Sequence, residues 1–439
     1  MRHPMSGAAG SWTRVAAVSA LALTLAAALP RTEAFAQATP DSLAGASVRS
    51  LALEEALRRA AAADPARAGL EARSRAAEAG VRQADVRPNP TLGLMVENLP
   101  TLGSGDILGR TETTLSYEQQ IERGGDRPAR VNLARGEGAL VLATARVRQL
   151  DRLETVQRAW TEVLTSEAQL EIARERLVLA ERFQSEVQRR VDAARDPLFA
   201  GARAEAELAQ AQIDFDQAEI SMRIARISLA KFWDGAGDFE VGPAAFEDTS
   251  ASRVAAGEAA QADFDVFLAQ RGIADARVRV EQARAIPDPT LSVGVRHIWD
   301  NDLSLVFGGS IPLQRHDRNQ GAIDRARAEG TAYQADLEAF RIDREREIAR
   351  LQVQLLARAH EARRIAEEIL PQAERAVSLV QEGFARGGFT YNDVMAAHVA
   401  LLETRARRVA VLEQFHTDRA RLDRLTGAHA DLLGLEIQP

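Results

Sequence analysis

An internal duplication limits the folds that are open to this chain of 439 residues. Arg87-Pro88-Asn89-Pro90-Thr91-Leu92 recurs as Ile286-Pro287-Asp288-Pro289-Thr290-Leu291, and Arg135-Gly136-Glu137-Gly138 recurs as Arg327-Ala328-Glu329-Gly330. Each Pro-x-Pro motif ends a helix, because proline lacks an amide N–H and disfavours helix in the residue before it. We therefore expect two copies of one unit: a helix, a break, two short strands, a very long helix, a turn and a second helix. The first copy is longer around Pro100–Arg110, and loop tips tolerate such insertions.

Two short strands follow each break, and all four share one alternating design. Every second residue is apolar, and most residues between are small, polar or charged. The apolar members are Leu92, Leu94, Val96, Leu115, Tyr117 and Ile121 in the first copy and Leu291, Val293, Val295, Leu303, Leu305, Phe307 and Ile311 in the second. This pattern is typical of a membrane barrel with a wet lumen, but a sheet that packs one face on a helix alternates in the same way. A barrel needs about eight strands, so it would require several chains.

A very long helix follows each strand pair. No Gly-Pro loop interrupts the chain from about Ala129 to Ala194 or from about Ile323 to Arg386, so each stretch can run for about 60 residues, or about 90 Å. Pro371 is expected to kink the second helix without ending it. Narrow apolar stripes of coiled-coil type support both helices of the second pair. They comprise Ile348, Leu351, Leu355, Ala359, Ala362, Ala366, Ile369, Ala373, Val377, Val380 and Phe384, then Met395, Val399, Leu402, Ala406, Val409 and Leu412.

Composition and charge exclude several classes of function. The net charge is −8, and 55 basic residues are interspersed with 63 acidic ones, so no basic face is available for nucleic acid. The chain has no cysteine, which excludes disulfides, thiolate metal sites and cysteine nucleophiles. The histidines form no i, i+4 zinc pair, and no Walker, Gly-x-Ser-x-Gly or Gly-x-Gly-x-x-Gly motif occurs. We therefore expect no enzyme and no cofactor.

Residues 1–36 are interpreted as a cleavable secretory signal. Arg2 and Arg14 give it a positive start, the run Val15–Leu29 is almost wholly apolar, and Ala34-Phe35-Ala36 fits a small-x-small cleavage site. A membrane anchor is the alternative, but spanning a bilayer takes about 20 apolar residues and this run is shorter. No later run is long and apolar enough to span as a helix, so a mature chain that enters a membrane must do so as strands.

Five pieces of the chain, in this order, resemble the TolC-type outer-membrane efflux family, and within it the heavy-metal (CzcC-like) branch. They are Leu51–Leu57, Pro88–Leu92 with its repeat, Gln120–Arg127, Ile369–Glu374 and Gly387–Val394. The resemblance implies a fold that is mainly α with a small membrane β part. It implies a homotrimer in which four strands per chain close a 12-stranded barrel, with a long α-helical coiled-coil tunnel in the periplasm. The implied partners are a periplasmic adaptor protein, an inner-membrane RND-type pump and the outer-membrane lipid of a Gram-negative bacterium.

The two copies divide the chain into nine segments. The signal is followed by a series of helices, hairpins and connections that repeats once. The segments are 1–36 (signal peptide), 37–87 (N-terminal helices), 88–123 (first β-hairpin), 124–236 (first coiled-coil helix pair), 237–262 (equatorial linker), 263–286 (helix of the second repeat), 287–314 (second β-hairpin), 315–427 (second coiled-coil helix pair) and 428–439 (C-terminal tail).

The resemblance also suggests functional residues at the two helix turns. These tips would form the periplasmic mouth and contact the adaptor, although their composition also suits plain helix ends. The residues concerned are Asp196, Pro197, Leu198, Gly387, Gly388, Phe389 and Thr390. Asp393 matches an acidic position that forms a ring at the closed mouth in relatives, where three carboxylates would favour cations. The alternative is that Asp393 or Asn392 stabilises the N-terminus of the last helix.

One group of polar residues is a candidate metal contact. His297, Asp300 and Asp302 lie near strand ends, where they could contact a metal cation in transit or simply be solvated. No resident metal is expected.

A passive exit duct is the function that these observations favour. It would export heavy-metal cations through a continuous water-filled path while an energised partner moves the cargo. The alternatives are a periplasmic coiled-coil adaptor or scaffold with a soluble sheet, and a duct for drugs or secreted proteins.

Overall fold

The computed structural model describes residues 51–98, 111–250, 257–298 and 302–433. The expected signal, the insertion around residues 100–110 and Asp300 lie outside these ranges. None of the helices within them combines the length and the hydropathy needed to cross a lipid bilayer.

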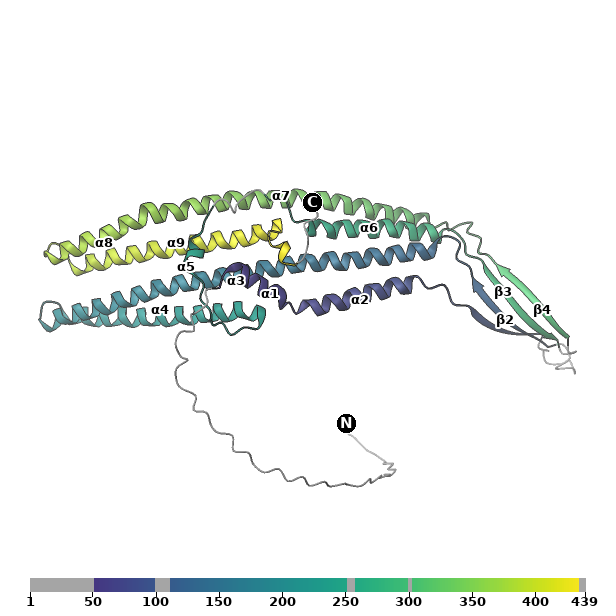
Figure 1. The fold of residues 1–439 in the computed structure, drawn as a ribbon, viewed down its shortest axis with the longest axis horizontal. Helices are drawn as coiled ribbons and strands as arrows, with labels where there is room; N and C mark the ends of the chain where they lie inside the picture. The colour runs from purple at the N-terminus through teal and green to yellow at the C-terminus, as the bar shows by residue number, and fades with distance from the viewer. Residues whose placement is uncertain (1–50, 99–110, 251–256, 299–301, 434–439) are drawn as a thin grey trace, which may run out of the picture. The chain divides into compact units, whose positions relative to one another are not determined.

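Each half of the chain contains the expected series of elements (Figure 1). The first half comprises α1 (Leu53–Ala62), α2 (Ala66–Ala84), β1 (Thr91–Glu97), β2 (Glu112–Gln120), α3 (Asp126–Asp192) and α4 (Leu198–Ala230). The second half comprises α6 (Gln261–Arg284), β3 (Thr290–Ile298), β4 (Asp302–Ser310), α7 (Gln320–Arg364), α8 (Leu370–Ala385) and α9 (Tyr391–Thr426). Short helices connect and end the halves: a 3-10 turn (Lys231–Trp233), α5 (Pro243–Glu247) and a final 3-10 turn (Ala430–Leu433).

The long helix of the first half is uninterrupted. α3 has 67 residues, which corresponds to about 100 Å. It begins after Gly125, whose φ of 80° is in the left-handed region that glycine adopts without strain. The carboxylate of Asp126, in the first turn of α3, interacts favourably with the positive end of the helix dipole.

The long helix of the second half contains one irregular turn. α7 leads into a π-helical turn at Ile365–Ile369, and α8 continues from Leu370 with Pro371 in its first turn. The helix therefore continues past Pro371, as expected. The expected burial of Ile369 is wrong, because its side chain is 44% exposed whereas Ile365 is buried. A π turn contains one residue more than an α turn, so it rotates the apolar stripe away from a regular spacing.

The apolar stripe expected on α9 is also partly wrong. Val399 and Ala406 are exposed, whereas Val394 and Leu401 are buried. α9 packs against α3 as well as against α7 and α8, so its buried face is broader than a two-helix seam and is centred elsewhere.

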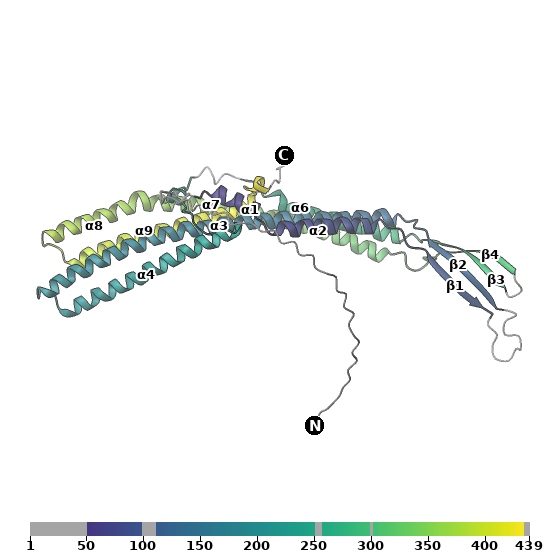
Figure 2. The same cartoon turned by 60° about the horizontal axis from the view of Figure 1, so that its bottom comes forward.

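The helices lie side by side in two consecutive groups (Figures 1 and 2). Toward the helix turns the order is α4, α3, α9, α8, and toward the sheet it is α2, α3, α6, α7. The largest buried cluster lies where the two groups meet. It joins α1, α3, α4, α9 and the linker, and includes Leu57, Val156, Leu229, Phe246 and Leu412. Within the described ranges, α4 does not pack on α8, nor α2 on α7, so each group has two free edges.

The four strands form one antiparallel sheet in the order β1-β2-β3-β4. The β2–β3 pair joins the two halves of the chain, with Tyr117 opposite Val293. In the described chain β1 and β4 are edge strands, each with one unpaired side.

Candidate functional site

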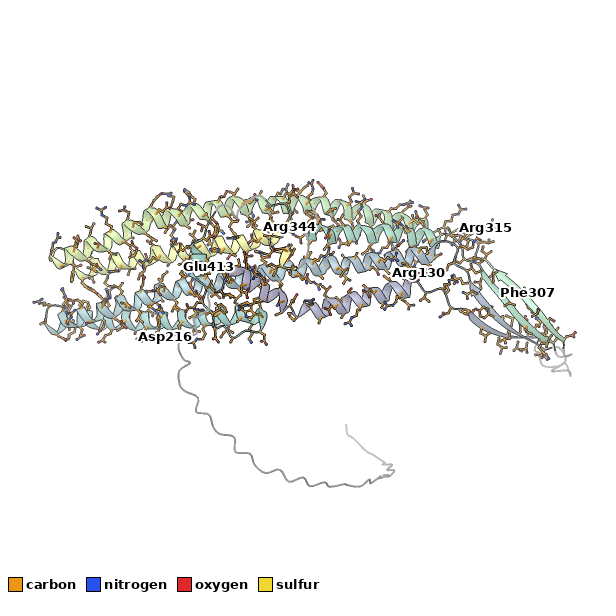
Figure 3. The ribbon with its side chains drawn as sticks, in the orientation of Figure 1. Arg130, Asp216, Phe307, Arg315, Arg344 and Glu413 are labelled. Atoms are coloured by element: carbon orange, nitrogen blue, oxygen red, sulfur yellow. The ribbon has the colours of Figure 1, made fainter. Side chains whose placement is uncertain are left out.

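One face of the sheet is apolar and exposed. The register aligns residues of all four strands into rows across this face. Two of the rows are Leu94–Leu115–Val295–Leu305 and Leu92–Tyr117–Val293–Phe307. Every member is exposed, from 42% for Val293 to 76% for Phe307, which Figure 3 labels on β4. No described helix packs extensively on the sheet, so the interpretation as a sheet with one face packed on a helix is wrong.

The opposite face is polar and carries a charged group near the strand ends. Arg296 donates to Glu112 from Nη1 at 3.0 Å and to the Thr114 hydroxyl from Nε at 3.2 Å. Its Nη2 lies 3.5 Å from a Glu97 carboxylate oxygen. Asn98 donates its amide N–H to the same Glu112 at 3.0 Å. The sheet thus has one face suited to lipid and one suited to water.

The structure does not bring the candidate metal contacts together. His297 is opposite Leu303 in the β3–β4 register and so belongs to the apolar face. Asp302 is opposite Ile298, one residue along, and so belongs to the polar face. Asp300 lies outside the described residues. No group of three or more His, Asp or Glu side chains in the described ranges is arranged to hold a metal ion.

An ion pair fixes the turn between α3 and α4. Arg190 donates to the two carboxylate oxygens of Asp196 at 2.8 and 3.1 Å, and this hydrogen bonding lowers the pKa of Asp196. Pro197 is extended and precedes the helix, which has no side-chain cap. Leu198 and Phe199 at the start of α4 are 83% and 73% exposed, so this tip presents apolar side chains to its surroundings.

Glycines shape the turn between α8 and α9. Gly387 has a φ of 79°, and the N–H of Gly388 donates to the carbonyl of Gly383 at 2.9 Å. The Phe389 ring lies over Gly383, where an added Cβ would come within 2.1 Å of the ring. Phe389 is nevertheless 48% exposed. This tip therefore also presents an aromatic side chain outward.

Thr390 and Asp393 form a capping box at the start of α9. The Asp393 carboxylate accepts the Thr390 backbone N–H at 2.8 Å and the Thr390 hydroxyl at 2.7 Å. The Thr390 hydroxyl accepts the Asp393 N–H at 3.3 Å. These hydrogen bonds from Thr390 lower the pKa of Asp393. The expected helix-capping role of Asp393 is confirmed, and its role in a ring requires other copies of the chain.

Aromatic side chains join the two tips, and of these only Phe384 belongs to an apolar stripe expected from the sequence. Tyr391 on α9 stacks on Phe183 of α3 with ring centroids 4.8 Å apart, and Phe384 of α8 contacts it edge-on at 5.6 Å. Burial, with a smaller contribution from Glu186, raises the pKa of Tyr391 to about 12. No spacing rule predicts the stacking of Tyr391 on Phe183, because these two residues lie on different hairpins.

A buried ionic group ties α9 to α6 and α3. Arg424 donates to both carboxylate oxygens of Asp263 at 2.9 and 2.8 Å and to Asp151 at 2.5 Å. The side chains of Arg424 and Asp263 are each only 4% exposed. Burial alone would lower the pKa of Arg424, but the hydrogen bonds to Asp263 and Asp151 raise it. Aligning the two copies matches Asp263 with Asp64, because each stands equally far before its Pro-x-Pro motif, but the alignment does not identify Arg424 as the partner of Asp263.

The described fold combines duplicated helices that have free edges with a sheet that has one apolar and one polar face. The profile of the family described as "Outer membrane efflux protein" matches residues 56–235 and 255–428, one match in each copy. The chain belongs to this family of outer-membrane efflux proteins. The resemblance seen in the sequence is confirmed, and the family is one of channels and not of enzymes.

A curated relative and two solved structures are similar over most of their length. The cobalt-zinc-cadmium resistance protein CzcC of Cupriavidus metallidurans is 31% identical over 359 residues, which cover 80% of this chain and 84% of that protein. The outer membrane protein VceC of Vibrio cholerae has a TM-score of 0.64 and 20% identity, and the match covers 85% of this chain and 96% of VceC. A membrane protein from Pseudomonas aeruginosa has a TM-score of 0.69 and 16% identity, with 87% and 93% covered. These two structures confirm the fold class.

Proposed function

We propose that three copies of this chain form a passive exit duct for heavy-metal cations in the outer membrane. The apolar face of the sheet contacts lipid, and the polar face lines the water-filled path. The observation that carries the proposal is the exposed apolar face, which no described helix covers. A soluble adaptor or scaffold would have to cover such a face with protein, because an exposed apolar surface of this extent marks an interaction with membrane or protein.

Free edges at every level support closure by further copies. The chain is open at β1 and β4 in the sheet, at α2 and α7 in one helix group, and at α4 and α8 in the other. In each case one free edge belongs to the first half and the other to the second. A head-to-tail interface of this kind closes a ring when the rotation between copies allows it. Three copies supply twelve strands, enough for a closed barrel with an open lumen.

The duplication gives the register of the closing strands. Within the chain β2 of the first half pairs with β3 of the second, so by the same symmetry β4 pairs with β1 of the next copy. Leu115 is opposite Val295 in the internal pair. Leu115 is opposite Leu94 in the first hairpin, and Phe307 is opposite Val293, the counterpart of Leu94, in the second, so Phe307 is the counterpart of Leu115. Val96 is the counterpart of Val295. The same register between copies therefore places Phe307 opposite Val96 of the neighbouring copy. Both residues lie on the apolar face, so the transferred register preserves the two-sided pattern.

The tips are proposed to form the periplasmic mouth and to contact an adaptor protein linked to an inner-membrane RND-type pump. Exposed apolar side chains at both turns, Leu198 and Phe389 among them, support this. Asp393 is proposed to contribute one carboxylate of a three-fold ring while it caps α9. Within one chain, hydrogen bonds from Thr390 lower the pKa of Asp393, which favours the charged carboxylate that such a ring needs.

Heavy-metal cargo is supported by the relative CzcC, whose name refers to cobalt, zinc and cadmium. We propose that the duct itself does not select among these metals and that the pump does. Residues 1–36 are proposed to be a cleavable export signal. A duct for drugs or secreted proteins is the competing cargo assignment.

Two measurements test the function. A deletion strain should become sensitive to cobalt, zinc or cadmium and keep normal tolerance of dyes and antibiotics; the reverse pattern would overturn the cargo assignment. The purified chain in planar bilayers should conduct ions and prefer cations. Asp393→Ala should reduce that preference and Asn392→Ala, at the same turn, should not, whereas equal selectivity in both variants would remove the ring.

A further inference from the structure

Four exposed arginines lie on the connections between the sheet and the helices. Arg87 precedes β1, Arg123 follows β2, and Arg315 and Arg318 lie between β4 and α7. Within the described ranges none of their guanidinium groups has a hydrogen-bond or ion-pair partner. Figure 3 labels Arg315 beside the sheet, where its side chain projects away from the ribbon.

Neighbouring arginines at the same junction are held by protein groups. Arg127 donates to both carboxylate oxygens of Asp85 at 2.8 and 2.9 Å. Arg130, also labelled in Figure 3, pairs with Glu122 and donates to the Val86 carbonyl at 3.1 Å. The junction therefore contains two kinds of arginine: one kind fastens the connections together, and the other kind is available to an external partner.

Exposed apolar side chains accompany the unpaired arginines. Val86, Ile121 and Ile311 are 49%, 40% and 46% exposed, and Leu313 is 77% exposed. Ile121 and Ile311 directly follow the ends of β2 and β4, so they extend the exposed apolar face of the sheet toward the helices. An arginine at such a boundary packs its aliphatic stem on apolar surface while its guanidinium reaches a polar layer.

We propose that Arg87, Arg123, Arg315 and Arg318 bind the phosphates of anionic phospholipids in the leaflet nearest the helices. This inference rests on the proposed function, because it requires the sheet to stand in a bilayer. Charge complementarity and continuity with the apolar face both favour a lipid partner. A guanidinium fits a phosphate through two parallel N–H···O bonds, which a lysine cannot provide.

Composition supports the same assignment. Membrane barrels commonly hold their position with girdles of aromatic residues at the interface. The chain has only 4 Trp and 3 Tyr, and the connections 86–90, 121–125, 285–289 and 311–319 contain none of them. Arginine with a neighbouring aliphatic side chain takes the place of the aromatic girdle in these connections.

Native mass spectrometry of the purified full chain in detergent tests the proposal with an equimolar mixture of phosphatidylglycerol and phosphatidylcholine. The wild-type protein should retain phosphatidylglycerol preferentially. The variant with Arg87→Gln, Arg123→Gln, Arg315→Gln and Arg318→Gln should retain the two lipids equally. Each arginine near an anionic surface corresponds to about fivefold in binding, so paired variants (Arg87→Gln with Arg123→Gln, and Arg315→Gln with Arg318→Gln) should lose part of the preference.

A matched control removes the same charge elsewhere. Arg73, Arg75, Arg271 and Arg375 are exposed and have no ion-pair partner within the described ranges, but they lie on α2, α6 and α8. Their four-fold replacement by Gln should leave the preference for phosphatidylglycerol intact. If both four-fold variants lose it equally, net charge is responsible and the proposal is overturned. The paired variants decide the matter if the junction variant does not fold.

Two further arms separate the possible failures. Inorganic phosphate should not displace phosphatidylglycerol; complete displacement at equal concentration would identify a free-phosphate site and overturn the lipid assignment. Insertion into vesicles of phosphatidylcholine alone reports on the proposed function. A wild-type protein that inserts and conducts but retains both lipids equally contradicts only the arginine proposal, whereas a protein that does not insert contradicts the duct itself.

Discussion

The two halves of the chain differ in the charged side chains that surround one pair of equivalent aspartates with buried side chains, Asp64 and Asp263. Asp64 in the first half corresponds to Asp263 in the second, and Arg152 corresponds to Arg344, by their distances from the repeated motifs. Arg152 Nε lies 3.5 Å from Asp64, and Arg344 Nη2 lies 3.7 Å from Asp263, so both copies keep a loose buried pair.

The second half adds a residue that the first half lacks. Arg424 fills the space beside Asp263, whereas its counterpart Lys231 points outward, is 64% exposed and lies near Asp234. At the equivalent place in the first half there is instead an open pocket of about 420 Å³, bordered by Arg152, Lys231 and Trp233. The two halves thus share the same series of helices and strands, but only the second has a buried arginine, Arg424, that pairs closely with the equivalent aspartate.

A large effect is predicted for the ion pair between Arg424 and Asp263. Asp263→Ala leaves the buried Arg424 with only Asp151, and we expect a loss of about 3 kcal/mol in the free energy of unfolding. Asp64→Ala, its counterpart, should lose about 1–2 kcal/mol: the ion pair is longer and Arg152 keeps a hydrogen bond to the Phe232 carbonyl, but the variant also removes the acceptor of the Ala66 N–H at 3.0 Å. Denaturant unfolding of the detergent-solubilised protein measures both. Equal losses would show that Asp64 and Asp263 contribute equally to stability and would contradict this comparison.

The strands should behave alike in the two halves. Val293 and Leu94 are counterparts on the apolar face, so replacing either by Arg should cost about 2–4 kcal/mol in the membrane. Ser292→Arg is the control on the polar face, where Glu118 is the cross-strand partner, and it should cost well under half as much. Stability of the folded protein in lipid vesicles reports the difference. If Ser292→Arg proved as costly as Val293→Arg, the assignment of the faces would fail.

The helix turns provide a smaller contrast. Thr390→Ala removes the hydroxyl that caps α9 and should cost about 1 kcal/mol. Pro197, its counterpart before α4, makes no side-chain cap. Pro197→Ala should therefore change the rate of hydrogen exchange in the first turn of α4 far less than Thr390→Ala changes it in α9. Similar exchange in both helices would indicate that the capping box is unimportant.

Acid should loosen both tips to a small extent. Hydrogen bonds lower the pKa of Asp196 and of Asp393 from the ordinary value of 3.8, so each carboxylate stabilises the folded tip above that value. This stability is lost as the pH falls through the lowered pKa of the folded state. Hydrogen exchange at the tips, corrected for its intrinsic pH dependence, should rise below about pH 4. Asp393→Asn should abolish that rise in α9 alone; a rise that persists would assign it to another group.

Much of the architecture could be predicted from the sequence, because its signals are local. The Pro-x-Pro motifs and the uninterrupted stretches from Ala129 and Ile323 predicted the element order, and strict alternation predicted the faces of the sheet. Pro371 predicted an irregularity in this part of the helix, but not that it takes the form of a π turn at Ile365–Ile369. The π turn displaced Ile369 from the core, and the exposure of Val399 followed from α9 having several partners.

Candidate site residues were predictable only where one turn of chain contains the whole interaction. Thr390 and Asp393 are three residues apart and form the capping box that such a spacing allows. His297 and Asp302, the described candidates for contact with a metal cation in transit, lie on opposite faces of the sheet, because the register between neighbouring strands decides which side chains share a face. Arg424 with Asp263, and Tyr391 with Phe183, are far apart in the chain and needed the fold.

Disulfide cross-linking between copies tests the central claim most directly, because the natural chain has no cysteine. The double variant Val96→Cys with Phe307→Cys should oxidise to a covalent trimer, since antiparallel partners lie within the Cα separation that a disulfide accepts. Leu92→Cys with Phe307→Cys, four residues out of register, should stay monomeric on a denaturing gel. A double variant at Val96 and Phe307 that remains monomeric, or links no better than the control, would contradict a duct closed by three copies.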